Sequence, residues 1–370
     1  MAHMQRDVRL LFTARSVRLF AYGALSVSLA LYLHEAGLNA EAIGLLFTLT
    51  LAGDAGISLW ITTTADRIGR KRMLILGAGL MSFAGIVFSL TGNIVYLTIA
   101  AVIGVISPSG NEIGPFLSLE QAALSQILPA GEWTKVFARY NLAGFRATAM
   151  GALASGFFSR FLTGIGFTEL QSYRAVILVY AVCGIALAVL FSFLSPDVET
   201  TAPAPAKDRV LGLHRSKGVV LRLAGLFALD AFAGGFVVQS MIAYWFHIKF
   251  GLEADTLGII FFCANILAGF STLLAANLAN RIGLINTMVF THIPSNVLLC
   301  LVPLMPNAVL AIVVLLLRFS ISHMDVPTRQ SYTMAVVAPD ERSAASGVTT
   351  IARSIGGAIS PVLSLSLIHI

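Results

Sequence analysis

The sequence predicts an all-helical membrane protein built from two related halves. Of its 370 residues, 57% are hydrophobic and 11% are charged, which is about half the charged fraction of a soluble domain. The apolar segments are long and continuous, which favours membrane-spanning helices over the alternating pattern of barrel strands. A short basic sequence at 65–72 lies between two of these segments and returns in altered form at 279–283, so one unit occurs twice.

Eleven apolar segments are long enough to cross a bilayer, for which roughly 17 to 25 residues suffice. They lie near residues 17–33, 43–63, 73–90, 95–119, 136–162, 175–194, 219–246, 257–278, 287–304, 309–333 and 344–365. All of the 24 lysines and arginines except Arg160, Arg174 and Lys249 fall in the spans, at their inner ends or in the loops on one side. The positive-inside rule therefore places the amino terminus inside, in a cytoplasmic membrane of bacterial type.

Residues 195–217 contain Ala-Pro-Ala-Pro-Ala and mixed charges, which predict a flexible cytoplasmic linker. This linker separates an amino-terminal six-helix bundle, 1–194, from a carboxyl-terminal bundle, 218–364, in which five helices are present. The last residues, 365–370, resemble the translation of a transposon end used for sequencing libraries. We therefore expect them to be a non-native tail that replaces a twelfth helix.

The composition also bounds the partners. The net charge of +6 comes from basic residues grouped in alternate loops, as membrane topology requires, so we expect no nucleic-acid binding. The cysteines Cys183, Cys263 and Cys300 all lie in predicted spans at unrelated spacing, which gives no metal or disulfide pattern. We expect a monomer in the lipid bilayer, with a small-molecule solute and no cofactor except protons as a coupling ion.

The basic loop reads Ala-Asp-Arg-Ile-Gly-Arg-Lys-Arg, and its second copy begins 214 residues later. It resembles the signature between the second and third helices of the major facilitator superfamily. The matching residues are Asp66, Arg67, Gly69, Arg70 and Lys71, with Arg72 after them and Asn280, Arg281 and Gly283 in the second copy. Thr62 replaces the usual first glycine of the signature. The alternative for this loop is a cluster of charges that only sets the topology.

The resemblance implies two six-helix halves around a central cavity that opens to either side in turn. It also implies that Asp66 braces the closed cytoplasmic side against the start of the eleventh helix, and that Arg70 pairs with an acid of the fourth helix, here Glu120. The fourth span lacks the arginine often linked to proton coupling in this family. The fifth lacks the Gly-Pro signature of drug and proton antiporters, which disfavours a multidrug pump.

Ionisable side chains inside the membrane cost about 2.5–3.5 kcal/mol each on insertion scales, so each needs a partner or water. The candidates are Arg18, Asp54, Glu112, Arg146, Asp230, Arg318, Asp325 and Arg353. We predict that Glu112, Asp325 and Asp54 serve proton coupling and that the arginines and Asp230 bind the solute. The alternative for Asp230 is a buried bond to Arg318 or Arg18.

Glu112 and Asp325 occupy equivalent places in the two halves, because 213 residues separate them and each precedes a proline, Pro115 or Pro327. Two carboxylates that approach each other across a cavity favour a shared proton.

Along the tenth span, Arg318, Asp325 and Arg329 fall on one helix face and could hold an anionic solute. The alternative is a structural pair of Asp325 with Arg329. His323 points to nearly the opposite side from Asp325, so neither a metal site nor a hydrolytic site is expected there.

These patterns predict a secondary transporter, not an enzyme, that moves a small organic solute with protons and works in efflux. One alternative is a uniporter or anion exchanger without proton coupling. The other is a membrane receptor that transports nothing, or an intramembrane enzyme, for which the sequence offers no catalytic set.

Overall fold

The structure, a computed structural model, describes residues 2–108, 115–128, 133–199, 215–337 and 342–367. These residues form helices and no strand. The α-helices are α1 (Ala2–Glu35), α2 (Ala40–Ile68), α3 (Arg70–Leu90), α4 (Ile94–Ile103), α5 (Phe116–Ile127), α6 (Trp133–Gly164), α7 (Glu169–Ser192), α8 (Lys217–Gly235), α9 (Gln239–Phe250), α10 (Ala254–Ile282), α11 (Leu284–Leu301), α12 (Ala308–Ile321), α13 (Asp325–Val336) and α14 (Arg342–Leu367). Two short 3-10 helices, η2 (Pro196–Val198) and η3 (Val302–Leu304), follow α7 and α11.

Each of the eleven predicted spans coincides with one long helix or with two helices in series. The fourth span is α4 followed by α5, the seventh is α8 followed by α9, and the tenth is α12 followed by α13. By length and composition, seven helical segments within the described residues could each cross a membrane, and α4 and α12 are shorter apolar helices. The all-helical membrane fold predicted from the sequence is therefore confirmed.

Local sequence signals set where several helices begin and end. Asn39 accepts a hydrogen bond from the Ala42 N–H at the start of α2, and Thr168 forms a capping box with Gln171 at the start of α7. Gly69 separates α2 from α3 with φ 111°, and Gly283 separates α10 from α11 with φ 87°. Residues with a side chain rarely adopt these φ values, which explains why both copies of the repeated loop have glycine at this position.

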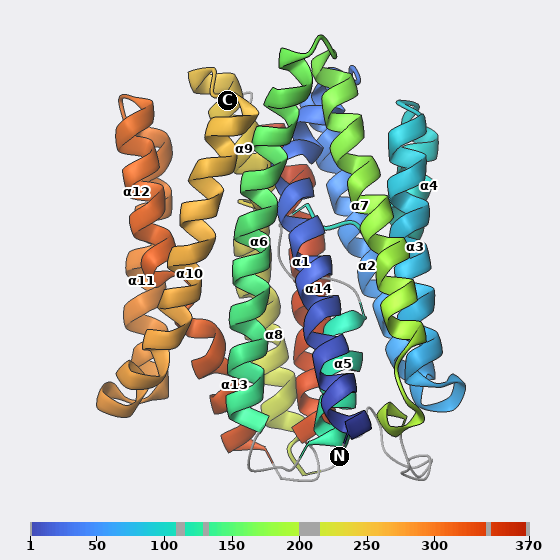
Figure 1. The fold of residues 1–370 in the computed structure, drawn as a ribbon. Coiled ribbons are helices and arrows are strands. Elements are labelled where there is room, and N and C mark those ends of the chain that lie inside the picture. Colours follow the sequence, from blue (N-terminus) through green and yellow to red (C-terminus); the bar gives the residue numbers. More distant parts are fainter. Residues whose placement is uncertain (1, 109–114, 129–132, 200–214, 338–341, 368–370) are drawn as a thin grey trace.

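The helices stand side by side in one bundle, with α2, α3 and α4 at one edge and α10, α11 and α12 at the other (Figure 1). Near the middle, α1 packs along α6 and α7, α8 packs along α14, and both α6–α10 and α2–α14 are in contact. A Cβ atom added to Gly23 would overlap the Thr148 carbonyl, and one added to Gly151 would overlap that of Phe20. The backbones of α1 and α6 therefore touch, as is typical where small residues mediate helix packing in membranes.

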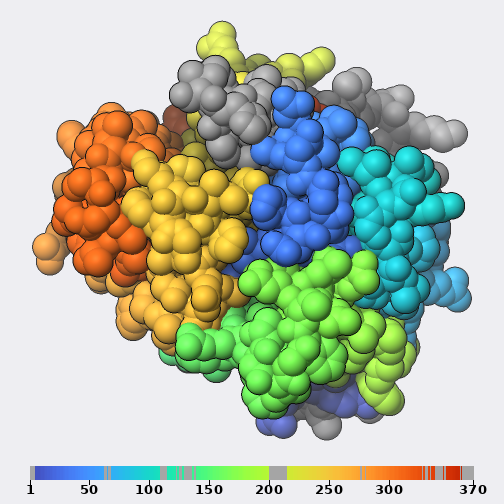
Figure 2. Space-filling model, turned by 90° about the horizontal axis from the view of Figure 1, so that it is seen from above, coloured from blue at the N-terminus to red at the C-terminus, as the bar shows by residue number. Residues whose placement is uncertain are grey.

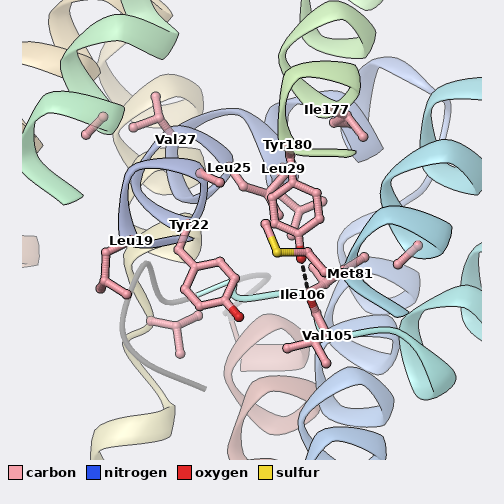
Figure 3. Close-up of a cluster of buried hydrophobic side chains, with 14 of the residues drawn as sticks. Leu19, Tyr22, Leu25, Val27, Leu29, Met81, Val105, Ile106, Ile177 and Tyr180 are labelled. Carbon is pink, nitrogen blue, oxygen red and sulfur yellow. Dashed lines mark hydrogen bonds between the residues drawn. The ribbon is translucent and has the colours of Figure 1, made fainter. Parts of the chain in front are cut away.

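An apolar core joins α1, α3 and α7 with the segment that follows α4 (Figure 3). Tyr22 and Tyr180 are fully buried in it, and their rings stack with centroids 6.2 Å apart. The Tyr180 hydroxyl donates a hydrogen bond to the Val105 carbonyl, so the polar end of this side chain is satisfied inside the core. This bond fixes the chain where it leaves α4.

Candidate functional site

The first charged cluster lies inside the amino-terminal helices. Both terminal nitrogens of the Arg18 guanidinium donate to the Glu120 carboxylate, each at 2.6 Å, and the Tyr140 hydroxyl donates to the same carboxylate. The guanidinium also lies over the Phe116 ring, 4.6 Å from its centroid. Arg18, Glu120 and Tyr140 have no exposed surface. This bidentate pair is neutral and sealed.

The basic loop after α2 is attached to the segment after α7. The backbone N–H groups of Arg70 and Lys71 donate to the Glu199 carboxylate at 2.6 and 3.2 Å, where the positive end of the α3 dipole favours an anion. Lys71 Nζ donates to the Leu194 carbonyl at 2.8 Å. Glu120 therefore pairs with Arg18 and not with Arg70, and the expected Arg70–Glu120 pair is wrong.

The bracing role of the loop stays a prediction. The side chains of Asp66, Arg67 and Asn280 lie outside the described part of the chain. Arg281 is exposed at the end of α10.

The second charged cluster joins four helices of the carboxyl-terminal half. Asp230 on α8 accepts from Arg353 on α14 at 2.9 Å and from Arg329 on α13 at 3.3 Å. Its other oxygen lies 3.0 Å from Nε2 of His292 on α11. Arg329 also donates to Asp325, the first residue of α13, at 2.7 Å. We call these five residues the Asp230 cluster.

The Asp230 cluster differs from the Arg18 pair in its access to the surroundings. The exposed fraction of the side chain is 27% for Asp230, 33% for Arg353 and 39% for His292. Arg329 and Asp325 are more buried, at 13% and 11%. The ends of these ion pairs can therefore be reached by water or by a bound molecule, whereas Arg18 and Glu120 cannot.

The two clusters occupy corresponding places in the repeated halves. Asp230 follows Arg18 by 212 residues, and both Arg329 after Phe116 and Arg353 after Tyr140 follow by 213. These offsets agree with that of the repeated loop to within two residues. The first helix of one half thus carries the cation and the first helix of the other half carries the acid.

Several predicted site residues have other surroundings than expected. Asp230 pairs with Arg329, Arg353 and His292, so its expected bond to Arg318 or Arg18 is wrong. Asp54 is buried on α2, where the Ser58 hydroxyl donates to it at 3.3 Å.

Arg146 is exposed on α6. Glu112 lies outside the described residues, so its pairing with Asp325 stays a prediction. The predicted face of Arg318, Asp325 and Arg329 is interrupted, because α12 ends at Ile321 and α13 begins only at Asp325.

His292 is the member of the Asp230 cluster that sequence reasoning missed. It is a lone histidine in an apolar helix, two residues before Pro294, and no motif surrounds it. Only the arrangement of the helices brings it to Asp230. Within the described ranges, no group of three or more His, Cys, Asp or Glu side chains is placed to hold a metal ion.

A buried polar network connects the two halves away from both clusters. Gln239 donates to the Ser26 hydroxyl at 2.7 Å, and the Ser240 hydroxyl donates to the Ser26 carbonyl at 2.9 Å. The Ser240 N–H donates to the Pro108 carbonyl at 3.1 Å, and Asn265 Nδ2 lies 3.4 Å from the Gln239 side-chain oxygen. This network binds α1 and the segment after α4 to the start of α9.

The two halves also meet at the end of the bundle opposite the amino terminus. Arg160 on α6 forms an ion pair with Asp255 on α10, and the Tyr244 hydroxyl lies 3.5 Å from Nδ1 of His34. Side chains from the ends of α1 and α2, α6 and α7, and α9 and α10 gather at the centre of this face (Figure 2). At this end, therefore, the halves are in contact.

The comparisons with known proteins agree with this architecture. The family model of the Major Facilitator Superfamily matches residues 11–361. An uncharacterized membrane protein of Saccharomyces cerevisiae, YJR124C, is 30% identical over 390 residues, which cover 97% of this chain and 87% of the yeast protein.

Among solved structures, the nucleoside transporter NupG has a TM-score of 0.75 at 14% identity and covers 97% of this chain and 90% of its own. A bacterial homologue of the human lysosomal transporter Spinster, inward-facing and unoccupied, has a TM-score of 0.75 at 17% identity, with 97% and 81% covered. A D-xylose-proton symporter has a TM-score of 0.71 at 14% identity, with 97% and 89% covered.

Proposed function

Because this chain belongs to the Major Facilitator Superfamily and is therefore a multi-pass membrane transporter and not an enzyme, we propose that it couples export of a small organic solute to proton movement. We place it as a monomer in a cytoplasmic membrane, with its amino terminus inside. The observation that carries the coupling is the Asp230 cluster, a partly exposed set of acids and bases within the membrane-spanning helices.

The coupling step uses the shared arginine of the cluster. Arg329 donates to Asp325 at 2.7 Å and to Asp230 at 3.3 Å, so one guanidinium serves two acids. If the guanidinium turns toward a solute, Asp325 loses its counter-ion. A carboxylate left without a partner inside a membrane is discharged by binding a proton. Solute and proton thereby affect each other through Arg329.

The other two acids predicted for proton coupling retain that role in the proposal. Asp54 is buried on α2, and Glu112 is the counterpart of Asp325 in the amino-terminal half by its position in the repeat. Because α2 packs along α14, the helix that carries Arg353, a change at Asp54 can reach the Asp230 cluster through one interface.

Transport in vesicles tests the proposal. The purified chain is reconstituted, and uptake of a panel of labelled nucleosides, sugars, amino acids and organic acids is measured with and without a pH gradient. We expect at least one solute whose flux follows the gradient, collapses with a protonophore and falls about tenfold or more in Asp325→Asn. Asp197→Asn, which changes an exposed acid after α7, is the matched control.

Two outcomes would replace the proposal. Flux that ignores the protonophore but depends on a counter-anion indicates an anion exchanger or uniporter. Binding without flux for every solute indicates a receptor. Reversal of the gradient in vesicles of known protein orientation decides between efflux and uptake.

A further inference from the structure

Arg318 is the charged side chain of the carboxyl-terminal half that the Asp230 cluster does not use. Its Nε is buried without a hydrogen-bond partner. The described residues give its guanidinium no ion pair, and its close contact is the Phe319 ring, 5.1 Å from the guanidinium carbon to the centroid. A buried guanidinium without an acceptor is costly in a membrane and is expected to serve a ligand.

The depth and direction of Arg318 exclude a simple escape to the membrane surface. It lies ten residues after the first residue of α12, Ala308, which is about 15 Å along the helix and half of a hydrocarbon core of about 30 Å. It shares a face with the buried Ala311 and Leu315. The exposed Val313 lies on another face, so Arg318 does not point toward lipid.

A charge balance of the spans gives the sign of what is missing. Within the carboxyl-terminal half, the spans contain the acids Asp230 and Asp325 and the arginines Arg318, Arg329 and Arg353. Asp230 and Asp325 are each in an ion pair with Arg329, and Asp230 also pairs with Arg353. Three cations against two anions leave one positive charge, and Arg318 is the arginine outside the network.

The surroundings of Arg318 restrict the ligand further. The residues 322–324 interrupt the helix next to it, and there the Ser322 hydroxyl lies 2.8 Å from Nδ1 of His323. The His323 ring stacks on Phe319 and packs edge-on against Phe145 of α6, which belongs to the other half. Aromatic faces and one guanidinium therefore come together at a junction between the halves.

We infer that the transported solute carries one carboxylate on an apolar or aromatic body and that Arg318 binds this carboxylate beside Phe319 and His323. A planar guanidinium binds a carboxylate through two parallel hydrogen bonds, which gives both charge balance and orientation. The inference rests on the proposed transport function and adds the class of its solute. One net positive charge matches a monoanion rather than a dianion or a cation.

Binding measurements test this inference without requiring transport. Benzoate, benzyl alcohol and benzylamine have similar bodies and differ in charge, and their binding to the purified full chain is measured by calorimetry and by thermal stabilisation. We expect benzoate to bind at least tenfold more tightly than the other two. Arg318→Gln should abolish this preference, and Arg222→Gln, at an exposed arginine of α8, should keep it.

Two further variants keep the test decisive if Arg318→Gln does not fold. Arg318→Lys retains the charge but not the paired donors, so benzoate should bind several-fold more weakly. Val314→Glu places an acid one helical turn away and should raise the unfolding temperature while it removes benzoate binding.

Equal binding of benzoate and benzyl alcohol to the unaltered chain would overturn the inference, because another group of the chain would then neutralise Arg318. A neutral or cationic solute moved by the pH gradient would also overturn it, and would leave the proposed function intact. If benzoate binds through Arg318 but no solute moves at all, the proposed transport fails and the binding site stands.

Discussion

At the residue scale, the membrane tolerates charged side chains here in two ways. Arg18 and Glu120 satisfy each other completely, with Tyr140 on a carboxylate oxygen, and all three are sealed from solvent. Asp230 instead divides its charge among three donors and stays about one quarter exposed. The sealed pair suits a fixed scaffold. The divided one suits a site whose partners change.

The sealed pair predicts a large loss of stability when one partner is removed. Arg18→Gln should cost about 3–5 kcal/mol, because Glu120 would then be buried without a counter-ion. The double variant Arg18→Leu with Glu120→Leu should lose less than the single one. Denaturant unfolding in detergent measures both. Arg160→Gln, at an ion pair whose arginine side chain is 66% exposed, is the control and should lose far less.

His292 predicts a pH dependence of transport. Imidazole changes charge between about pH 5 and 8, and the charged groups around His292 are Asp230, Asp325, Arg329 and Arg353. Protonated His292 competes with Arg329 and Arg353 for Asp230 and so frees them for a solute. Transport should therefore rise as the pH falls from 8 to 5.

Initial rates across this pH range test the histidine. His292→Gln should flatten the rise, whereas His247→Gln should not, because His247 lies at the end of α9 and bonds to the Leu252 carbonyl. A rise of the same size in His292→Gln would assign the pH dependence to another group.

At the element scale, spans four, seven and ten each consist of two helices, and the sequence predicted only part of this. Proline residues at 115 and 327 indicated that the fourth and tenth spans could open. In the tenth, however, the break lies at 322–324, before Pro327, so that Asp325 begins the second helix. The seventh span has no proline and breaks at 236–238, where the polar network of Ser240 and Gln239 compensates freed backbone groups.

The contact between α1 and α6 gives a prediction about glycine. Gly151→Ala should cost about 1–3 kcal/mol or prevent folding, because its new methyl group would overlap the Phe20 carbonyl. Gly79→Ala, in the middle of α3 with open space around it, should instead stabilise by about 0.5–1 kcal/mol. Thermal unfolding of the two variants separates helix contact from helix propensity. Equal effects would mean that α1 and α6 do not touch at Gly151.

At the scale of the whole molecule, the topology was predictable and the side-chain pairs were not. Hydropathy and the repeated loop depend on local sequence, and they located the spans and the glycines at 69 and 283 correctly. A pair such as Arg18–Glu120 depends on how two distant helices are rotated, which no local pattern records. For this reason Glu120 was assigned to Arg70, Asp230 to Arg318 or Arg18, and His292 to nothing.

The contact between the halves predicts how the molecule can be stopped. Arg160 and Asp255 form an ion pair at the end opposite the amino terminus, and a Cβ added to Gly156 would overlap the Asp255 backbone, so α6 and α10 touch there. If transport requires this end to open, a covalent link should abolish it. Arg160→Cys with Asp255→Cys, in a chain whose Cys183, Cys263 and Cys300 are replaced by serine, is joined by a short bis-maleimide.

Solute flux should fall to background after cross-linking and should be normal before it. The matched control joins Lys249→Cys to Pro303→Cys, since Lys249 Nζ donates to the Pro303 carbonyl at 3.0 Å within the carboxyl-terminal half. This link leaves the two halves free to separate, so flux should persist. Full transport by the Arg160–Asp255 cross-linked protein would mean that this end stays closed throughout the cycle, and the solute would then need another route past α6 and α10.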